Sequence, residues 1–198
     1  MLSLNLQGSA TNNLTMDQMN SNYETAILGG GCFWCTEAVF LAVKGVISVT
    51  SGYSGGFIKN PTYKEVCNGT TGHAEVVKVT FDPSVIKYSE ILNIFFNTHD
   101  PTTLNKQGGD VGTQYRSVIF YNDTQQKSEA EKIIKDLEAS SKFSRPIVTA
   151  IEKLPNFYKA EDYHQNYFAK NPNEAYCNLV VRPKVEKFKK NYSEKLKN

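Results

Sequence analysis

The chain has 198 residues, and its 22 Lys and Arg against 20 Asp and Glu give a net charge of +2. This length is enough for one domain with a full core. No run of residues is apolar enough to cross a membrane, the N-terminus lacks the features of a secretory signal, and four cysteines are too few for a disulfide scaffold. We therefore expect a cytoplasmic monomer with reduced thiols that binds neither nucleic acid nor membrane.

The expected elements follow a polar N-terminal segment. Residues 1–22 are rich in Asn, Ser and Thr without periodicity, so we expect a flexible arm before a single domain over 23–198. Apolar patterning predicts strands over 24–28, 46–50, 73–82, 114–121 and 146–153. Helical spacing predicts helices over 37–43, 88–98, 123–140 and 157–170.

The tail over 171–198 is expected to be irregular before a final helix. Residues 182–198 carry seven Lys or Arg against two Glu. Such a basic segment could contact nucleic acid or anionic lipid, but nothing else in the sequence indicates a polyanion partner. We interpret the basic residues as a solvated helix face.

The order of the expected elements is strand, helix, strand, strand, helix, strand, helix, strand. Its core resembles the split βαβ pattern of ferredoxin-like sheets. We therefore expect an α+β fold, with a two-layer sandwich around a mixed sheet, long loops and an irregular C-terminal tail. The polar segment over 100–112 contains three glycines and is long enough to be a functional loop.

The segment Gly29-Gly-Gly-Cys-Phe-Trp-Cys-Thr-Glu37 joins the first expected strand to the first expected helix. The glycines make the turn, which places Cys32 at the start of the helix. Free backbone N–H groups and the positive end of the helix dipole favour an anion there. The sequence therefore predicts that the Cys32 thiol ionises more easily than a free cysteine and acts as a nucleophile.

Cys32 and Cys35 form a Cys-x-x-Cys pair that has three interpretations. A structural zinc site needs about four ligands, and the other cysteines and the three histidines supply no second pair, so no metal is expected. The pair could exchange disulfides as in thioredoxin, or Cys32 could attack with Cys35 as a helper. Any single cysteine could instead be a small buried apolar residue, and Cys67 fits that interpretation best.

Glu75 lies in the strand expected over 73–82, where side chains alternate between two faces. It shares the apolar face with Val77, Val79 and Phe81. A carboxyl group on that face loses hydration, which raises its pKa and keeps the proton that a general acid donates. Periodicity alone leaves open that Glu75, near the strand end, turns to solvent or pairs with a cation.

Aromatic residues gather in the same segments as the candidate nucleophile. Phe33 and Trp34 directly follow Cys32, while Tyr63 and Tyr115 lie at the edges of loops. Most aromatic residues belong to a core, but this group could instead line a pocket. Such a pocket would suit a small apolar or sulfur-containing group and would have hydroxyl donors at its rim.

Several motifs, in order and over about residues 26–185, together resemble the A-type peptide methionine sulfoxide reductases. They are Gly31-Cys-Phe-Trp-Cys, Gly52-Tyr-Ser-Gly-Gly, Asn60-Pro-Thr-Tyr-Lys-Glu-Val-Cys, Thr71-Gly-His-Ala-Glu-Val, His99-Asp-Pro-Thr-Thr, Gly112-Thr-Gln-Tyr-Arg-Ser and Ala160-Glu-Asp-Tyr-His-Gln. The resemblance implies reduction of methionine S-sulfoxide, free or in proteins, to methionine. It also implies repair of oxidised proteins, thioredoxin as reductant and no bound cofactor.

The resemblance implies a role for each matched residue. Cys32 is the nucleophile that becomes a sulfenic acid, and Glu75 protonates the oxygen being expelled. Tyr63 and Tyr115 hold that oxygen through their hydroxyls. The residues implied to bind the rest of the substrate are Phe33, Trp34, Asp110, His164 and Tyr167.

The resolving cysteine does not follow a single family pattern. Many relatives have glycine at position 35 and resolve with a cysteine in a C-terminal tail, whereas others use the Cys-x-x-Cys partner. This chain has both Cys35 and Cys177. We expect Cys177 to resolve the sulfenic acid first, with Cys35 in a relay, and thioredoxin to reduce the resulting disulfide.

Two alternatives from other functional classes are compatible with parts of the sequence. A general dithiol oxidoreductase would use Cys32 and Cys35 on protein disulfides and would not need Glu75. A non-enzymatic module would use the aromatic residues to bind thioether or quaternary ammonium ligands.

Overall fold

The computed structural model describes residues 23–197, so the arm expected over 1–22 lies outside the described residues. Six strands form the main sheet: β1 Glu24–Gly30, β2 Val46–Ser54, β3 Ala74–Phe81, β6 Ser117–Tyr121, β7 Ala150–Lys153 and β8 Tyr158–Lys159. Their order across the sheet is β7-β6-β1-β3-β2-β8. A separate two-stranded hairpin consists of β4 Lys106–Gln107 and β5 Asp110–Val111.

Four strands and two helices form the core of the fold. Helix α2 Phe33–Leu41 connects β1 to β2, and helix α4 Tyr88–Thr98 connects β3 to β6. The pairs β6–β1, β1–β3 and β3–β2 are antiparallel, whereas β7 is parallel to β6. This is the split βαβ arrangement with a mixed sheet, so the predicted α+β fold is confirmed.

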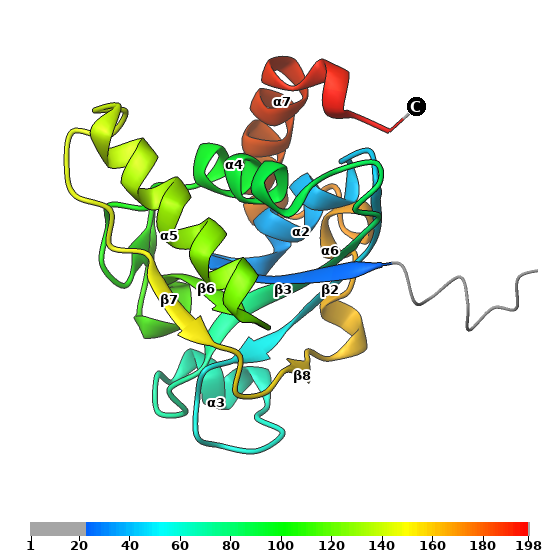
Figure 1. Cartoon of the computed structure of the whole chain (residues 1–198). Helices are drawn as coiled ribbons and strands as arrows, with labels where there is room; N and C mark the ends of the chain where they lie inside the picture. The colour runs from blue at the N-terminus through cyan, green and yellow to red at the C-terminus, as the bar shows by residue number, and fades with distance from the viewer. Residues whose placement is uncertain (1–22, 198) are drawn as a thin grey trace, which may run out of the picture.

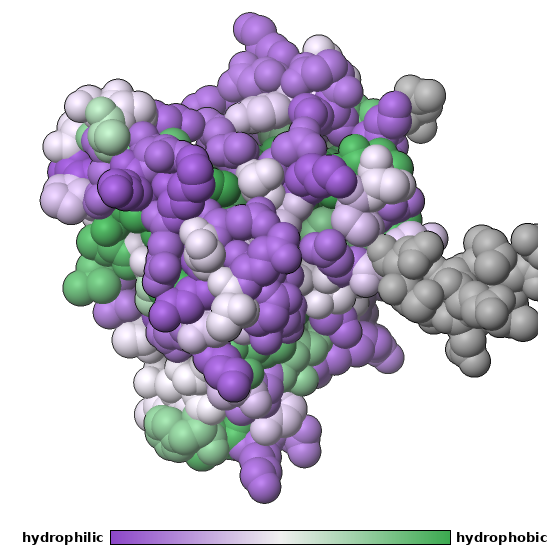
Figure 2. Space-filling view, viewed as in Figure 1, coloured by the Kyte–Doolittle hydropathy of each residue, from purple (hydrophilic) through white to green (hydrophobic). Residues whose placement is uncertain are grey.

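The remaining elements complete the helical layer and the loops around it. They are α3 Tyr63–Cys67, η1 Thr113–Tyr115, α5 Thr124–Ala139, η2 Asp162–His164, α6 Tyr167–Lys170, η3 Cys177–Val181, α7 Arg182–Asn191 and η4 Ser193–Lys195. Figure 1 shows α2, α4, α5 and α7 gathered on one side of the sheet. The surface over α5 and α7 in that view is mostly hydrophilic (Figure 2). No helix within residues 23–197 is long and apolar enough to span a bilayer.

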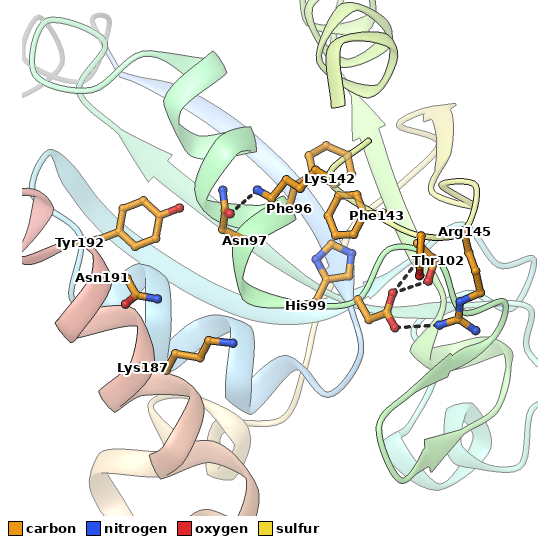
Figure 3. A pocket seen from close by; sticks show the side chains of 12 residues that line it. Phe96, Asn97, His99, Thr102, Lys142, Phe143, Arg145, Lys187, Asn191 and Tyr192 are labelled. Carbon is orange, nitrogen blue, oxygen red and sulfur yellow. Dashed lines mark hydrogen bonds and ion pairs between the residues drawn. The ribbon is translucent and has the colours of Figure 1, made fainter. Parts of the chain in front are cut away.

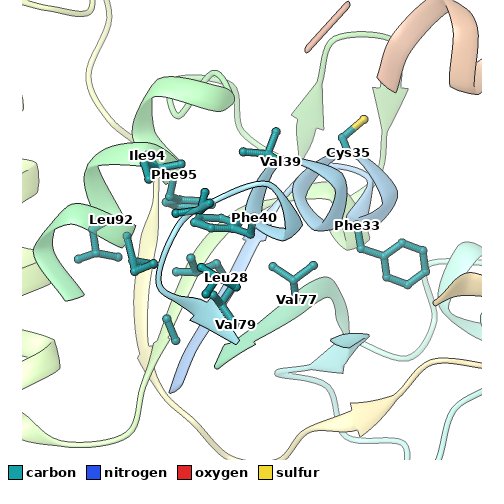
Figure 4. Packing of buried hydrophobic residues seen from close by; sticks show 14 of the residues in the cluster. Leu28, Phe33, Cys35, Val39, Phe40, Val77, Val79, Leu92, Ile94 and Phe95 are labelled. Carbon is teal, nitrogen blue, oxygen red and sulfur yellow. The ribbon is translucent and has the colours of Figure 1, made fainter. Parts of the chain in front are cut away.

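The larger core cluster lies between the sheet and these helices. Leu28 of β1 and Val77 and Val79 of β3 lie below Phe40 of α2 and Phe95 of α4 (Figure 4), and all five are fully buried. Burying one such side chain stabilises the fold by about 1.5–3 kcal/mol. Because side chains alternate along β3, every odd-numbered residue from position 75 to 81 faces this helical layer.

The opposite face of the sheet has a smaller cluster. Ile27, Val76 and Phe120 are buried there, and Phe157 packs against them from the segment before β8. This face is therefore covered by extended chain and loops instead of a helix. Helices α2 and α4, with the loops beside their first residues, therefore lie on the other face of the sheet.

The helix predicted over 157–170 is wrong. The chain there forms the edge strand β8, paired with β2 at Tyr53, followed by the short helices η2 and α6. The Gln165 side chain exchanges two 3.0 Å hydrogen bonds with the Ser51 backbone. Long-range pairing to the open edge of the sheet therefore overrides the local helical spacing.

Several other boundaries differ from the prediction. Helix α2 begins at Phe33, four residues before the predicted start, and β6 and β7 begin later than predicted. The final helix expected in the tail is present as α7, which buries Val185 and Phe188 against α2. The tail therefore packs on the helix that carries the Cys-x-x-Cys pair.

Candidate active site around Cys32

Strand β1 and helix α2 meet at Cys32, which is the N-cap residue of α2. Gly31 makes the turn with φ +91°, and a Cβ there would lie 2.6 Å from Gln107 Cγ, so only glycine fits. The Cys32 side chain is only 7% exposed. The start of the helix therefore presents a thiol that is nearly removed from solvent.

The Cys32 thiol hydrogen-bonds the Cys35 thiol and the Tyr176 hydroxyl. Burial raises the pKa of the Cys32 thiol well above that of a free cysteine, and the Cys35 hydrogen bond and the nearby Glu75 carboxyl raise it further. This direction is opposite to the easy ionisation predicted for Cys32, because burial of the thiol in the substrate-free site disfavours its charged form. The same hydrogen bond from Cys32 lowers the pKa of the Cys35 thiol.

Glu75 reaches from β3 to the start of α2. Its Oε2 accepts a 3.0 Å hydrogen bond from the backbone N–H of Phe33, the residue next to Cys32. The side chain is 1% exposed, and burial raises the pKa of its carboxyl to about 8, although the Phe33 hydrogen bond opposes the shift. The carboxyl therefore lies on the face that strand alternation predicted, and it holds a proton at neutral pH.

Three tyrosine hydroxyls of the site come from three separate short segments outside the sheet. Tyr63 begins α3, Tyr115 ends η1, and Tyr176 directly precedes η3. Burial raises the pKa of all three phenols, so each is a protonated donor at neutral pH. The Tyr176 hydroxyl donates to Asp110 Oδ2 at 2.7 Å while it contacts the Cys32 thiol.

Tyr176 was missed by the sequence reasoning. In the sequence, only its position beside Cys177 indicated a role for it, and it lies in a tail expected to be irregular. The structure shows that Tyr176 links Asp110 to Cys32 and packs edge-on against Trp34, with ring centroids 5.9 Å apart. The tail therefore forms part of the site.

An aromatic wall continues from the Cys32 segment. The Trp34 ring stacks on Tyr167, with centroids 3.8 Å apart and planes 6° apart, and its Nε1–H donates to His164 Nδ1 at 3.0 Å. His164 also packs against Phe33 and Tyr63 at centroid distances of 4.9 and 4.4 Å. Burial lowers the pKa of His164, so the ring is neutral and Nδ1 is free to accept.

Two further carboxylates, which the sequence reasoning left without a role, fix this wall. Glu161 accepts 2.8 Å hydrogen bonds from the Tyr53 hydroxyl and the Tyr63 backbone N–H. Glu37, on α2, accepts from the backbone N–H groups of Asn166 at 2.9 Å and Tyr167 at 3.3 Å. Glu37 thereby holds the start of α6, and with it Tyr167, against the helix that carries Trp34.

We expect Glu37→Ala to lower the free energy of unfolding by about 2–4 kcal/mol, because two N–H groups lose their acceptor in a buried setting. Glu37→Gln keeps one acceptor oxygen and should cost about half as much. Urea titration followed by the fluorescence of Trp34, the one tryptophan in the chain, measures both losses. Equal stability of Glu37→Ala and the wild type would contradict a structural role for these bonds.

The other two cysteines occupy different surroundings. Cys177 is fully buried at the start of η3, close enough to Cys35 for their charges to interact, and burial raises the pKa of its thiol. Cys67 is partly exposed and its thiol contacts the Tyr63 hydroxyl, so the expectation that it is simply buried is wrong.

The structure brings every residue singled out from the sequence to one region around Cys32. The site combines a buried thiol, a carboxyl that holds a proton, hydroxyl donors and an aromatic wall. Within residues 23–197, no group of three or more His, Cys, Asp or Glu side chains is arranged to hold a metal ion. The arrangement suits a compound with a polar oxygen on an apolar sulfur-containing group.

Comparison with known proteins finds similar sequences that cover almost the whole described chain. The family model for peptide methionine sulfoxide reductase matches residues 24–196. The peptide methionine sulfoxide reductase MsrA of Saccharolobus solfataricus is 56% identical over 174 residues, covering 88% of this chain and 97% of the relative.

Solved structures extend the likeness to the fold. The reduced form of Mxr1 from Saccharomyces cerevisiae superposes with a TM-score of 0.73 at 38% identity, covering 79% of this chain and 90% of that one. Mxr1 in complex with Trx2 has a TM-score of 0.53 at 27% identity, covering 79% of this chain and 91% of that one.

Proposed function

We propose roles for the residues around Cys32 from the premise that this chain belongs to the peptide methionine sulfoxide reductase family, as an A-type member. It is an enzyme that reduces methionine sulfoxide to methionine with thiols, and thioredoxin is its reductant. The observation that carries the assignment of roles is the hydrogen bond between Glu75 and the Phe33 N–H. It fixes a carboxyl that holds a proton beside the Cys32 thiol.

Glu75 is the general acid in this proposal. At neutral pH the empty site holds protons on both Cys32 and Glu75, because burial raises the pKa of each group. Glu75 gives its proton to the sulfoxide oxygen, which makes the substrate sulfur more electrophilic, and takes up the thiol proton as Cys32 Sγ attacks. The substrate loses its oxygen and gains two electrons, while the Cys32 thiol becomes a sulfenic acid.

The hydroxyls and rings around Cys32 orient the substrate. Tyr63 and Tyr115 donate hydrogen bonds to the sulfoxide oxygen, because both phenols keep their protons. Phe33 and Trp34 enclose the methyl group on the sulfur. The oxygen, the methyl group and the direction of attack by Cys32 Sγ are thus each fixed, and this proposal assigns the S epimer to that arrangement.

Asp110, His164 and Tyr167 hold the side chains around the reacting centre. Asp110 holds the Tyr176 hydroxyl, whereas His164 and Tyr167 hold the Trp34 ring. These residues position their neighbours, and they remove rotational freedom from the groups that contact the substrate.

The geometry favours Cys35, not Cys177, as the first thiol to resolve the sulfenic acid. Cys35 hydrogen-bonds Cys32 from one helical turn away, whereas Cys177 interacts with Cys35. Cys35 condenses with the sulfenic acid, so that a disulfide forms and water leaves. Cys177 then attacks the Cys35 sulfur, which frees Cys32 and moves the disulfide to the tail for thioredoxin.

We expect mass spectrometry after a stoichiometric turnover to find a Cys35–Cys177 disulfide in the wild type. The Cys177→Ser variant should stop at Cys32–Cys35. The Cys35→Ser variant should accumulate the sulfenic acid, which dimedone traps. Formation of Cys32–Cys177 at the same rate in the wild type and in Cys35→Ser would instead support direct resolution by Cys177, the order expected from the sequence.

A single assay tests the assignment of roles. Wild-type protein, methionine S-sulfoxide and dithiothreitol should give methionine, while methionine R-sulfoxide should remain. A general dithiol oxidoreductase would instead reduce protein disulfides, and Glu75→Gln would leave that activity intact. Equal turnover of both epimers would contradict the proposed enclosure of the methyl group by Phe33 and Trp34.

The remaining properties follow from the chemistry of the proposal. A cycle that runs through free thiols suits the cytoplasm, where thioredoxin keeps cysteines reduced. The proposed steps need neither a bound cofactor nor a metal, nucleic acid or membrane, and one copy of the chain supplies all the residues. Sedimentation of the purified protein should therefore give the mass of a monomer.

A further inference from the structure

A groove lies between the end of α4, the loop after α5 and helix α7 (Figure 3). It has a volume of about 640 Å³. Lys187 and Asn191 extend into it from α7, and Lys142 and Arg145 face it from the loop. A second hollow of about 290 Å³ continues the groove along α7 to Lys184.

The groove has more cations than anions. Lys142, Arg145 and Lys187 line it together with one carboxylate, Asp100. Asp100 is already engaged, since it forms an ion pair with Arg145 at 3.2 Å and accepts a 2.9 Å hydrogen bond from the Thr102 N–H. Within residues 23–197, neither Lys142 nor Lys187 forms an ion pair.

The surroundings of Lys142 leave its charge uncompensated. Its ammonium donates to the Asn97 amide oxygen, which is neutral, and burial lowers the pKa of the ammonium. Below it, His99 contributes no further charge, because burial lowers the pKa of its imidazole to about 4 and its nitrogens are bonded to Phe95 and Ser117. The excess of positive charge therefore belongs to the lysines at the mouth of the groove.

Further donors surround these lysines. The Asn191 amide and the Tyr192 hydroxyl lie on the α7 side. Ammonium, guanidinium, amide and phenol groups are all donors to oxyanions, and charge-assisted bonds of this kind are the strong ones. A volume of several hundred cubic ångströms is typical of sites for small molecules.

We propose that this groove binds a small oxyanion with at least two negative charges, of the phosphate or carboxylate type, which bridges Lys142 in the loop to Lys187 on α7. A multivalent anion would supply partners to both lysines at once, whereas a monovalent anion would leave one of them unpaired. The concave shape favours a small molecule over an acidic protein segment, which would suit a flatter surface.

Occupancy of the groove has a consequence for the tail. Helix α7 directly follows η3, which begins with Cys177. An anion that joins α7 to the loop after α5 would hold the tail in its packed position and oppose local opening. The amides of α7 should therefore become more protected when the anion is bound.

Isothermal titration with tripolyphosphate, repeated with citrate, tests the proposal. We expect saturable binding with one site, and a loss of affinity of about tenfold or more in Lys142→Gln and in Lys187→Gln, since each removes a charge-assisted contact. Lys189→Gln is the matched control, because it removes the same charge from the outer side of α7. Its affinity should stay within about twofold of the wild type.

Hydrogen exchange of the full chain supplies the structural readout. Tripolyphosphate should slow exchange over 184–192, and sodium chloride at the same ionic strength should not. Comparing the affinities for tripolyphosphate and citrate distinguishes a preference for phosphate from a preference for carboxylate. The proposal would be overturned by non-saturable binding, by equal losses in Lys187→Gln and Lys189→Gln, or by binding of an oligoglutamate peptide without binding of either small anion.

Discussion

Cys32→Ser is expected to lower the rate of methionine formation by about 10⁴-fold or more, because a serine hydroxyl is a far weaker nucleophile than a thiol and cannot form a sulfenic acid. The buried setting strengthens this expectation, since burial raises the pKa of the Cys32 thiol and would disfavour a serine alkoxide even more. A discontinuous assay of methionine formed from methionine sulfoxide and dithiothreitol measures the loss.

The same variant distinguishes loss of chemistry from loss of structure. Serine is close in size to cysteine, so the variant should unfold at nearly the wild-type urea concentration. After stoichiometric substrate, dimedone should label position 32 in Cys35→Ser and should label nothing when Cys32→Ser is added to that variant. Retention of a few per cent of the activity would show that another thiol, such as Cys35, can replace Cys32.

The elements that carry the site could be predicted from the sequence, because short-range rules control them. The glycines before Cys32 predicted a turn into a helix, and the structure has Cys32 as the N-cap of α2. Alternation along β3 placed Glu75 on the buried face, where Val77 and Val79 also lie. In both cases the decisive information lies within a few residues of the functional group.

Two features depended on distant contacts and were not predicted. Burial raises the pKa of the Cys32 thiol, and Tyr176, which contacts that thiol and lowers its pKa, belongs to the tail, 144 residues further along the sequence. The segment over 157–170 follows the open edge of β2 instead of its own helical spacing. The proximity of Cys177 to Cys35, which the expected relay requires, depends in turn on the packing of α7 against α2. Tertiary packing determines each of these features, and the periodicity of the sequence contains no information about that packing.

Glu75→Gln is expected to lower kcat/KM by about 10²–10⁴-fold, because the amide cannot give a proton to the sulfoxide oxygen. Glutamine is close in size and keeps an oxygen that accepts from the Phe33 N–H, so the hydrogen bond at the start of α2 should persist. The variant should therefore unfold at nearly the same urea concentration as the wild type. Glu138→Gln, on the exposed side of α5, is the matched control and should leave kcat/KM unchanged.

The pH profile identifies the protonation state in which the enzyme reacts. Burial raises the pKa of Glu75 in the free enzyme to about 8, and the acid form is the reactive one. The wild-type kcat/KM should therefore be level near neutral pH and fall above about pH 8, by about tenfold for each pH unit. Glu75→Gln has no group that titrates there, so its much lower kcat/KM should show no fall at that point.

A rise of kcat/KM through pH 8 would give the opposite conclusion. It would mean that Cys32 must lose its proton before the substrate binds, as expected from its position at the helix start, and that the thiol proton does not pass to Glu75. The protonation states of Glu75 and Cys32 are linked, because the Glu75 carboxyl lies close enough to raise the pKa of the Cys32 thiol. A carboxylate formed above pH 8 would hold the thiol proton more firmly, so ionising Glu75 removes the acid and opposes formation of the nucleophile at the same time.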